Sequence, residues 1–183
     1  MISKAARRYS NALYSLAAES NKVDELSGDF RQMLALIDAN RELELFFHTP
    51  AVSKMKKRAV VNEMFKGKIG TLSYNFLELL ISRSREALTH DIMTDFLNLK
   101  KEKDGIVDVN VKTAVELTDR EKSALEEKIN AYTGKKSELK FGIDKDIIGG
   151  FVAGIGDTVL DASIKRQLEM LKEKFRSGEF SSN

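Results

Sequence analysis

Residues 144–171 constrain the fold more than any other segment, because glycines divide them into short apolar runs followed at once by a helical pattern. Gly156 and Asp157 separate two of these runs, 151–155 and 158–160. A Gly-Asp dipeptide between two apolar runs is typical of a two-residue hairpin turn. The segment therefore predicts a pair of short antiparallel strands.

The residues around this hairpin extend the prediction to a sheet and a helix. Gly149, Gly150 and Gly154 are expected to mark bulges or close approaches of the backbone. Apolar residues at helical spacing follow immediately. They are Ile164, Leu168, Leu171 and Phe175. We therefore expect the final amphipathic helix to close a small sheet.

The hydrophobic period changes from 3.6 to 2 at Gly105, which divides the chain into two parts. Residues 107–113 alternate as a half-buried strand, and 139–143 give a second one. Between them, a Thr-Asp-Arg-Glu capping box at 118–121 opens a helix to about Tyr132. These elements predict a small C-terminal α/β domain over residues 105–183.

Residues 1–104 show only helical patterns and predict a bundle. The third helix is expected to end before Pro50, because proline restricts the backbone of the preceding residue. Ser53 can then cap the fourth helix. The fold class is therefore α+β, with an N-terminal six-helix bundle. The six helices are expected at about 2–16, 23–37, 42–47, 54–65, 72–85 and 90–103.

Composition removes several classes of function. The chain has 183 residues, no cysteine and a formal net charge of +2, so disulfides, thiolate metal sites and cysteine nucleophiles are excluded. Neither a membrane-spanning apolar run of roughly 18 residues nor a signal peptide of the usual form is present, which predicts a soluble protein. Residues 1–18 contain basic residues and no acidic one, as a mitochondrial presequence does.

Motifs for catalysis and cofactor binding are missing. The glycines at 149–156 do not fit Gly-x-Gly-x-x-Gly, and Gly134-Lys135 is followed by lysine rather than by the serine or threonine of a phosphate-binding loop. His48 and His90 have no carboxylates at metal-binding spacing and are interpreted as loop or capping residues. We expect no catalytic residue, no cofactor and no metal.

Asp157, Asp161 and Arg166 resemble an acid pair with an electrophilic arginine, but a structural interpretation explains them better. Asp157 suits the turn, and Asp161 or Ser163 suits the cap of the last helix. Arg166 is then expected to pair with one of the two aspartates.

A basic cluster around the fourth helix is the one feature that suggests a polyanion. Because no aromatic residues are interleaved with it to stack on bases, a solvated helix face is favoured and no nucleic acid is expected. A weak contact with acidic partner segments or anionic lipid headgroups stays open. The cluster consists of Lys54, Lys56, Lys57, Arg58, Lys66 and Lys68.

The fifth helix is apolar around most of its circumference, which requires burial on more than one side. It either lies at the centre of the bundle, or one face meets the core while another forms a groove with small residues of the first helix. The apolar residues concerned are Phe76, Leu77, Leu79, Leu80 and Ile81.

The glycines and polar residues of the hairpin segment resemble the C-terminal signature of the delta subunit of rotary ATP synthase, the family of the mitochondrial oligomycin-sensitivity-conferring protein. The matching residues are Gly150, Gly156, Asp157, Asp161, Ser163, Arg166 and Leu168. Residues 6–13 are similar to the first helix of that family, so the resemblance extends from about residue 4 to about residue 175. It implies that the first residues belong to the fold and are not a presequence.

The resemblance implies a non-catalytic peripheral-stalk subunit on the cytoplasmic face of a bacterial plasma membrane, held there indirectly through the complex. The bundle, 1–104, would bind the N-terminal helix of the alpha subunit, and 105–183 would bind the C-terminal end of the b subunit. A helical adaptor of another complex is the alternative. A small hydrolase is a third class, but it would need a concave acidic site that the sequence does not indicate. The residues implied for alpha binding are Ala6, Tyr9, Ser10, Leu13, Phe76, Leu79, Leu80 and Arg83.

Overall fold

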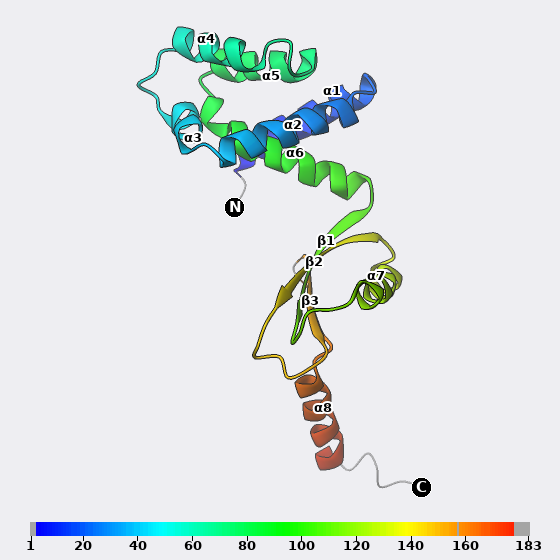
Figure 1. The fold of residues 1–183 in the computed structure, drawn as a ribbon. Coiled ribbons are helices and arrows are strands. Elements are labelled where there is room, and N and C mark those ends of the chain that lie inside the picture. Colours follow the sequence, from blue (N-terminus) through cyan, green and yellow to red (C-terminus); the bar gives the residue numbers. More distant parts are fainter. Residues whose placement is uncertain (1–2, 157, 178–183) are drawn as a thin grey trace. The chain divides into compact units, whose positions relative to one another are not determined.

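A computed structural model describes residues 3–156 and 158–177 of the chain (Figure 1). The chain divides into two compact units, Met1–Lys103 and Asp104–Asn183. We call them the helical unit and the C-terminal unit and describe each by itself.

Over residues 3–103, the helical unit contains the six expected α-helices and one short 3₁₀ helix. The fifth helix ends at Ser82 rather than at Arg85, because Ser84 adopts a positive φ of 53° that interrupts the helical path. The helices are α1 (Lys4–Glu19), α2 (Val23–Asp38), α3 (Arg41–His48), α4 (Lys54–Phe65), α5 (Thr71–Ser82), η1 (Glu86–Leu88) and α6 (Thr89–Lys103).

Phe30 on α2 is the centre of the core of the helical unit. Its ring is fully buried and lies 6.0 Å from the ring of Phe76 on α5 and 5.1 Å from that of Phe96 on α6. Tyr14 on α1 also reaches the Phe96 ring, at 5.8 Å. One aromatic cluster therefore joins four helices, and α1 lies along α6 (Figure 1).

The C-terminal unit is a four-stranded sheet packed against α7. The sheet order is β2-β1-β3-β4, with β1 and β2 parallel and the other pairs antiparallel. Leu125 and Ile129 of α7 meet Val109, Val111 and Ala153 in its core. The elements are β1 (Ile106–Thr113), α7 (Asp119–Thr133), β2 (Lys136–Ile143), β3 (Phe151–Ile155), β4 (Thr158–Asp161) and α8 (Ile164–Ser177).

The predicted hairpin is present. Ile155 pairs with Thr158, so the connection has two residues, and Gly156 has the positive φ of 57° that a primed turn requires. Asp157, the other residue expected in the turn, lies outside the described residues. Gly154 keeps a regular register between two strands, so the expectation of a bulge or close approach there was wrong.

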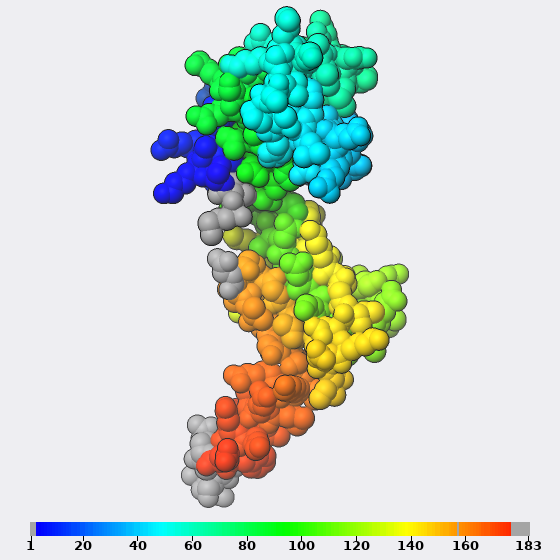
Figure 2. Space-filling model, turned by 90° about the vertical axis from the view of Figure 1, so that its left-hand side faces the viewer, coloured from blue at the N-terminus to red at the C-terminus, as the bar shows by residue number. Residues whose placement is uncertain are grey.

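The expectation that the last helix closes the sheet was also wrong. None of the side chains described on α8 is buried, because α7 already covers the core face of the sheet. The face of α8 turned toward the viewer in Figure 2 is uncovered. The predicted apolar stripe is exposed along its length, with exposed fractions of 44% for Ile164, 58% for Leu168, 43% for Leu171 and 64% for Phe175.

Candidate interaction surfaces

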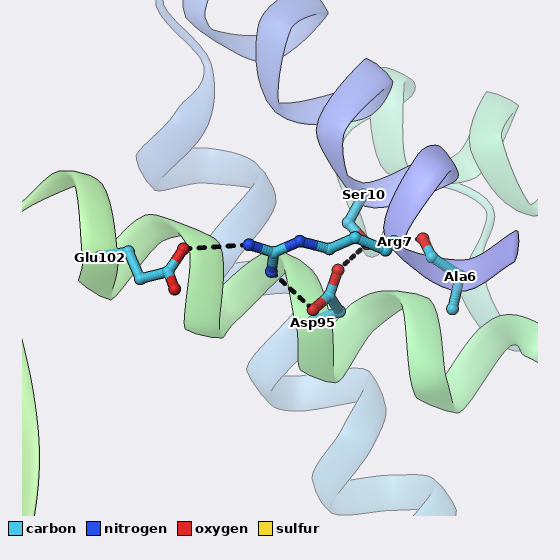
Figure 3. Close-up of polar contacts among 5 residues, drawn as sticks. All are labelled: Ala6, Arg7, Ser10, Asp95 and Glu102. Carbon is cyan, nitrogen blue, oxygen red and sulfur yellow. Dashed lines mark hydrogen bonds and ion pairs between the residues drawn. The ribbon is translucent and has the colours of Figure 1, made fainter. Parts of the chain in front are cut away.

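A polar network fixes α1 on α6 (Figure 3). The Arg7 guanidinium bonds Asp95 at 2.8 Å and Glu102 at 3.1 Å, while the Ser10 hydroxyl lies 2.6 Å from Asp95 Oδ2. Asp95 is only 2% exposed, and its hydrogen bond with Arg7 raises the pKa of that guanidinium. A buried carboxylate is stable only when paired in this way, so the network determines which face of α1 turns inward.

Five of the eight residues expected to contact a partner therefore lie in the core. The polar network and the apolar packing of α1 and α5 occupy the side chains of these five residues. The residues therefore lie beneath the accessible surface of the two helices. These residues are Ala6, Ser10, Leu13, Phe76 and Leu80, with exposed fractions between 0% and 6%.

An apolar flank on α1 remains accessible. Tyr9 is half-buried and Leu16 is 50% exposed. Helical spacing puts Tyr9 and Leu16 on one side of α1, together with Ala12, and puts Tyr14, which contacts α6, on the other side. Leu16 was not among the expected binding residues, although its spacing from Tyr9 and Ala12 indicates the shared flank.

A second apolar flank lies on α5. Leu79 is 44% exposed and Arg83 is exposed one turn later. Helical spacing puts Leu79 and Arg83 close together and roughly 100–140° around α5 from Glu78, whose carboxylate pairs with Arg58 of α4 at 3.1 Å. The α4 contact thus leaves the Leu79 side of α5 free.

Two open cavities flank the loop between β1 and α7 in the C-terminal unit. One, of about 440 Å³, is lined mainly by apolar side chains that include Val115 and Ile148, which are 67% and 77% exposed. The other, of about 460 Å³, includes Phe141 and Ile143, which are 38% and 60% exposed. Exposed apolar residues gathered in this way mark an interaction surface.

The polar residues of the hairpin segment have structural roles. Asp161 accepts a hydrogen bond from the Ser163 backbone at 2.9 Å, and the hydrogen bonds with Ser163 lower the pKa of the Asp161 carboxyl. Ser163 Oγ accepts from the Arg166 backbone at 3.2 Å, so Ser163 is the residue that caps α8. The Arg166 guanidinium lies 3.8 Å from Glu169, one turn on. It was expected to pair with Asp157 or Asp161, and Asp157 lies outside the described residues.

Gly150 in the same segment is required by its surroundings. Its φ is +80°, and a Cβ there would lie 2.4 Å from the carbonyl oxygen of Ala162. The backbone of the loop before β3 thus passes directly against the segment that leads into α8, which is also tied to it by the bond from Ile164 N to Gly149 O at 2.9 Å.

Over residues 3–156 and 158–177, no group of three or more histidine, aspartate and glutamate side chains is arranged to hold a metal ion. In the same ranges, no helix combines the length and the apolar character needed to cross a bilayer. His90 pairs with Asp38 at 3.1 Å, and His48 ends α3.

The sequence is similar to one well-defined family. Residues 5–175 match the family model described as ATP synthase delta (OSCP) subunit. ATP synthase subunit delta of Chloroherpeton thalassium is 37% identical over 97% of both chains, and that of Salinibacter ruber is 36% identical over 97% of this chain and 93% of the relative. That of Desulforudis audaxviator is 35% identical over 93% and 94%.

The fold is shared with a solved structure. A chain in the cryo-EM structure of the Toxoplasma gondii mitochondrial ATP synthase hexamer superposes with a TM-score of 0.71, over 94% of this chain and 98% of that one. The two sequences are 19% identical, so this similarity concerns the fold.

Proposed function

The chain belongs to the ATP synthase delta (OSCP) subunit family, and from this premise we propose that its helical unit binds the N-terminal helix of the alpha subunit and its C-terminal unit the end of the b subunit. As a member of this family it is a non-catalytic subunit of the peripheral stalk of ATP synthase. The alternative of a helical adaptor for another complex is set aside by this membership.

The observation that carries the alpha-subunit proposal is the pair of accessible apolar flanks on α1 and α5. Leu16 and Leu79 are 50% and 44% exposed, although Leu13, Ala17 and Leu80 of the same two helices are buried in the core. An amphipathic partner helix buries residues at i, i+3, i+4 and i+7, which is the pattern that such apolar flanks accept. Arg83 at the end of the α5 flank then suits an acidic residue of the same helix.

The b-subunit proposal rests on the exposed stripe of α8 and on the two cavities beside α7. Leu168 and Phe175 lie on an amphipathic helix none of whose described side chains is buried, and a helix of this kind is stabilised when a second helix covers its apolar stripe. The end of a stalk made of helices supplies such a partner.

These two contacts give the protein the role of a clamp. Ion flow turns the rotor and exerts torque on the catalytic head, and a connection between the head and a stationary stalk prevents the head from turning as well. A clamp that persists over many turnovers requires nanomolar affinity, about −12 kcal/mol, which interfaces of roughly 1,600 Å² can supply. We place the protein on the cytoplasmic face of a bacterial plasma membrane, held there through the complex.

Calorimetry with a synthetic peptide of the N-terminal helix of the alpha subunit tests the first contact. Leu79→Asp puts a charge into the proposed apolar interface and is expected to weaken binding by about 2 kcal/mol, roughly thirtyfold. Leu45→Asp is the matched control, because Leu45 is 53% exposed on α3, outside both flanks. Equal affinity of the Leu79→Asp variant and the wild type, with both folded, removes the α5 flank from the interface.

A further inference from the structure

The apolar stripe of α8 has the spacing of a coiled-coil seam. Its members follow one another at intervals of four, three and four residues, which is the alternation of positions a and d in a heptad repeat. At about 100° per residue, the four side chains span roughly 60° of the helix circumference. A helix that packs on a globular core usually has a stripe of about 100° or more. The stripe consists of Ile164, Leu168, Leu171 and Phe175, and we call it the α8 seam.

Positive charge borders the α8 seam on both sides. In a coiled coil, heptad positions e and g lie beside the seam and face the partner helix. With Leu168 at position a, these bordering positions are occupied by Lys165, Gln167, Lys172 and Lys174, all of which are exposed. The acidic residues of the helix, Glu169 and Glu173, occupy the outer positions b and f. The charges of α8 are therefore sorted, with basic residues beside the seam and acidic residues away from it.

The first residue of the α8 seam is held against the loop before β3. The backbone N–H of Ile164 donates a hydrogen bond to the carbonyl oxygen of Gly149 at 2.9 Å. The side chain of Ile164 packs so closely on Gly149 that a Cβ there would lie 2.6 Å from Ile164 Cδ1. Gly149 also lines the apolar cavity of about 440 Å³. The seam therefore begins beside this cavity, and one partner can cover both.

We propose that α8 forms a two-stranded coiled coil with a helix at the end of the b subunit, and that this helix carries acidic residues beside its own apolar seam. The inference rests on the proposed function for the identity of the partner. It adds the geometry of the contact and the charge of the partner. Charge complementarity identifies the acidic residues, because the charges at positions e and g set partner choice in coiled coils.

The same bordering positions disfavour a second copy of this chain as the partner. In an antiparallel pair of α8 helices, position e faces position e, so Lys165 faces Lys172 of the second copy. In a parallel pair, position g faces position e, so Gln167 faces Lys172. Neither arrangement brings an acidic residue to a lysine, and like charges at facing positions repel. A partner with acidic bordering positions relieves this repulsion.

The narrow seam also favours a helix over a membrane surface. A membrane-surface helix buries a broad apolar face in the lipid. Met170 is 41% exposed and lies outside the α8 seam, and the side of α8 away from the seam carries Glu169 and Glu173. These carboxylates are repelled by anionic headgroups, whereas a coiled coil leaves them in water. A single helix laid along the seam covers the apolar residues and avoids this repulsion.

Calorimetry with the full chain and a synthetic peptide of the C-terminal helix of the b subunit tests the role of charge. Lys165→Glu/Lys172→Glu is expected to bind about tenfold more weakly at low salt, a difference that disappears near 1 M salt, where the Debye length is about 3 Å. A single added charge, as in Gln167→Asp, is expected to cost about twofold. Arg166→Glu/Arg176→Glu is the matched control, because it makes the same charge change at outer positions. Equal losses in the two double variants overturn the proposal, since net charge alone then explains them.

Two neighbouring residues of similar exposure test the heptad geometry without changing charge. Leu171 is 43% exposed and lies in the α8 seam, whereas Met170 is 41% exposed and lies outside it. Leu171→Ala is expected to weaken binding of the b peptide about tenfold, and Met170→Ala by less than about twofold. Alanine is a strong helix former, so both variants should keep the helical content of the wild type. Equal losses would show a broad apolar contact and overturn the coiled coil.

Designed peptides separate failure of this inference from failure of the proposed function. Both carry leucine at positions a and d, and one has glutamate and the other lysine at every e and g. The wild type is expected to bind the glutamate peptide at least about tenfold more tightly. If it does so but does not bind the b peptide, the assignment to the b subunit fails and the acidic preference stands. If it binds the b peptide but both designed peptides equally, the proposed function stands and this inference is overturned.

The remaining measurements test the other occupants. Sedimentation of the wild type is expected to give a monomer at micromolar concentration, and a dimer that Leu171→Ala dissociates would make the occupant a second copy. Binding to phosphatidylglycerol vesicles that Leu171→Ala abolishes, with unchanged affinity of this variant for the b peptide, would make it a membrane. Either result overturns the proposal.

Discussion

Asp29 on α2 caps the N-terminus of α5 from a different helix. Its Oδ2 accepts a hydrogen bond from the backbone N–H of Gly70 at 2.8 Å and also bonds the hydroxyl of Ser73. Gly70 has no side chain to act as a cap, and a Cβ there would lie 2.2 Å from Glu25 Oε1. The start of α5, and with it the position of the Leu79 flank, is therefore fixed by a residue 41 positions earlier.

Asp29→Ala is expected to destabilise the helical unit by about 1–2 kcal/mol, because it removes the cap of α5 and leaves the Ser73 hydroxyl without its partner. Urea unfolding followed by circular dichroism measures this change. Asp24→Ala is the control on the same helix, since the Asp24 side chain is 95% exposed and its removal should change stability by less than about 0.5 kcal/mol. Similar values for the two variants would show that the cap contributes nothing.

The buried Lys57–Glu86 pair predicts a dependence of stability on pH. Burial opposes ionisation of Glu86 and is the largest single effect, but the hydrogen bond from Lys57, a backbone hydrogen bond and the positive charges of Lys57 and Lys54 together outweigh it. The pKa of Glu86 is therefore lowered from its ordinary value of 4.5. The stability that this carboxylate contributes is thus fully present above pH 4.5 and is lost as the pH falls through the lower folded-state pKa.

Glu86→Gln is expected to lower the free energy of unfolding by about 1–3 kcal/mol at pH 7, because it leaves the Lys57 ammonium buried without a counter-charge. The difference from the wild type should shrink as the pH falls below 4.5, since wild-type Glu86 then becomes neutral as well. Denaturant unfolding at several pH values measures both effects. A difference that stays constant down to the acid limit contradicts the assignment of this pH dependence to Glu86.

Signals that depend on neighbours in the chain could be predicted from the sequence. Ser53 caps α4, and Thr118 and Glu121 form the reciprocal capping box, both as expected. The two-residue hairpin connection between Ile155 and Thr158 could be predicted for the same reason. Each of these features involves residues a few positions apart, so the amino-acid types at fixed spacing already contain the information.

The choice of which face each helix buries could not be predicted in the same way. The first helix has apolar or small residues on more than one side, and its inner face is selected by Asp95, 85 positions after Ser10 in the sequence. Likewise, the stripe of α8 predicts burial but not the chain that supplies it, because an amphipathic pattern is the same for a core and for an interface. Ala6 and Ser10 were expected to contact a partner but are buried, because the inner face of α1 is selected by a distant residue. The final helix was expected to pack on the sheet but is exposed, because its pattern does not say which chain covers it.

Gly150→Ala is expected to destabilise the C-terminal unit by about 1–3 kcal/mol or more, because alanine is strained at a φ of +80° and its Cβ would clash with the Ala162 carbonyl. Gly142→Ala is the control. Gly142 has no atom within 4 Å of the position of a Cβ, so alanine there should be neutral or slightly stabilising. Thermal unfolding of both variants compares them, and an unchanged midpoint for Gly150→Ala would mean that this close approach does not exist in solution.

The exposed stripe of α8 gives the last prediction, which separates folding from binding. Leu168 and Leu171 are 58% and 43% exposed and have no core to leave, so Leu168→Asp and Leu171→Asp should change stability by less than about 0.5 kcal/mol. If the stripe meets the b subunit, each should weaken binding of a peptide from the end of the b stalk by about 2 kcal/mol in calorimetry.

Gln167→Asp supplies the matched control, because it adds the same charge beside the stripe on an exposed residue. A comparable loss of binding in this variant would assign the effect to charge and not to apolar contact. Unfolding of the C-terminal unit by Leu168→Asp would instead mean that α8 packs on the sheet in the free chain. The stripe would then be part of a core that the b stalk has to open, and affinity for the peptide should rise in variants that weaken that packing.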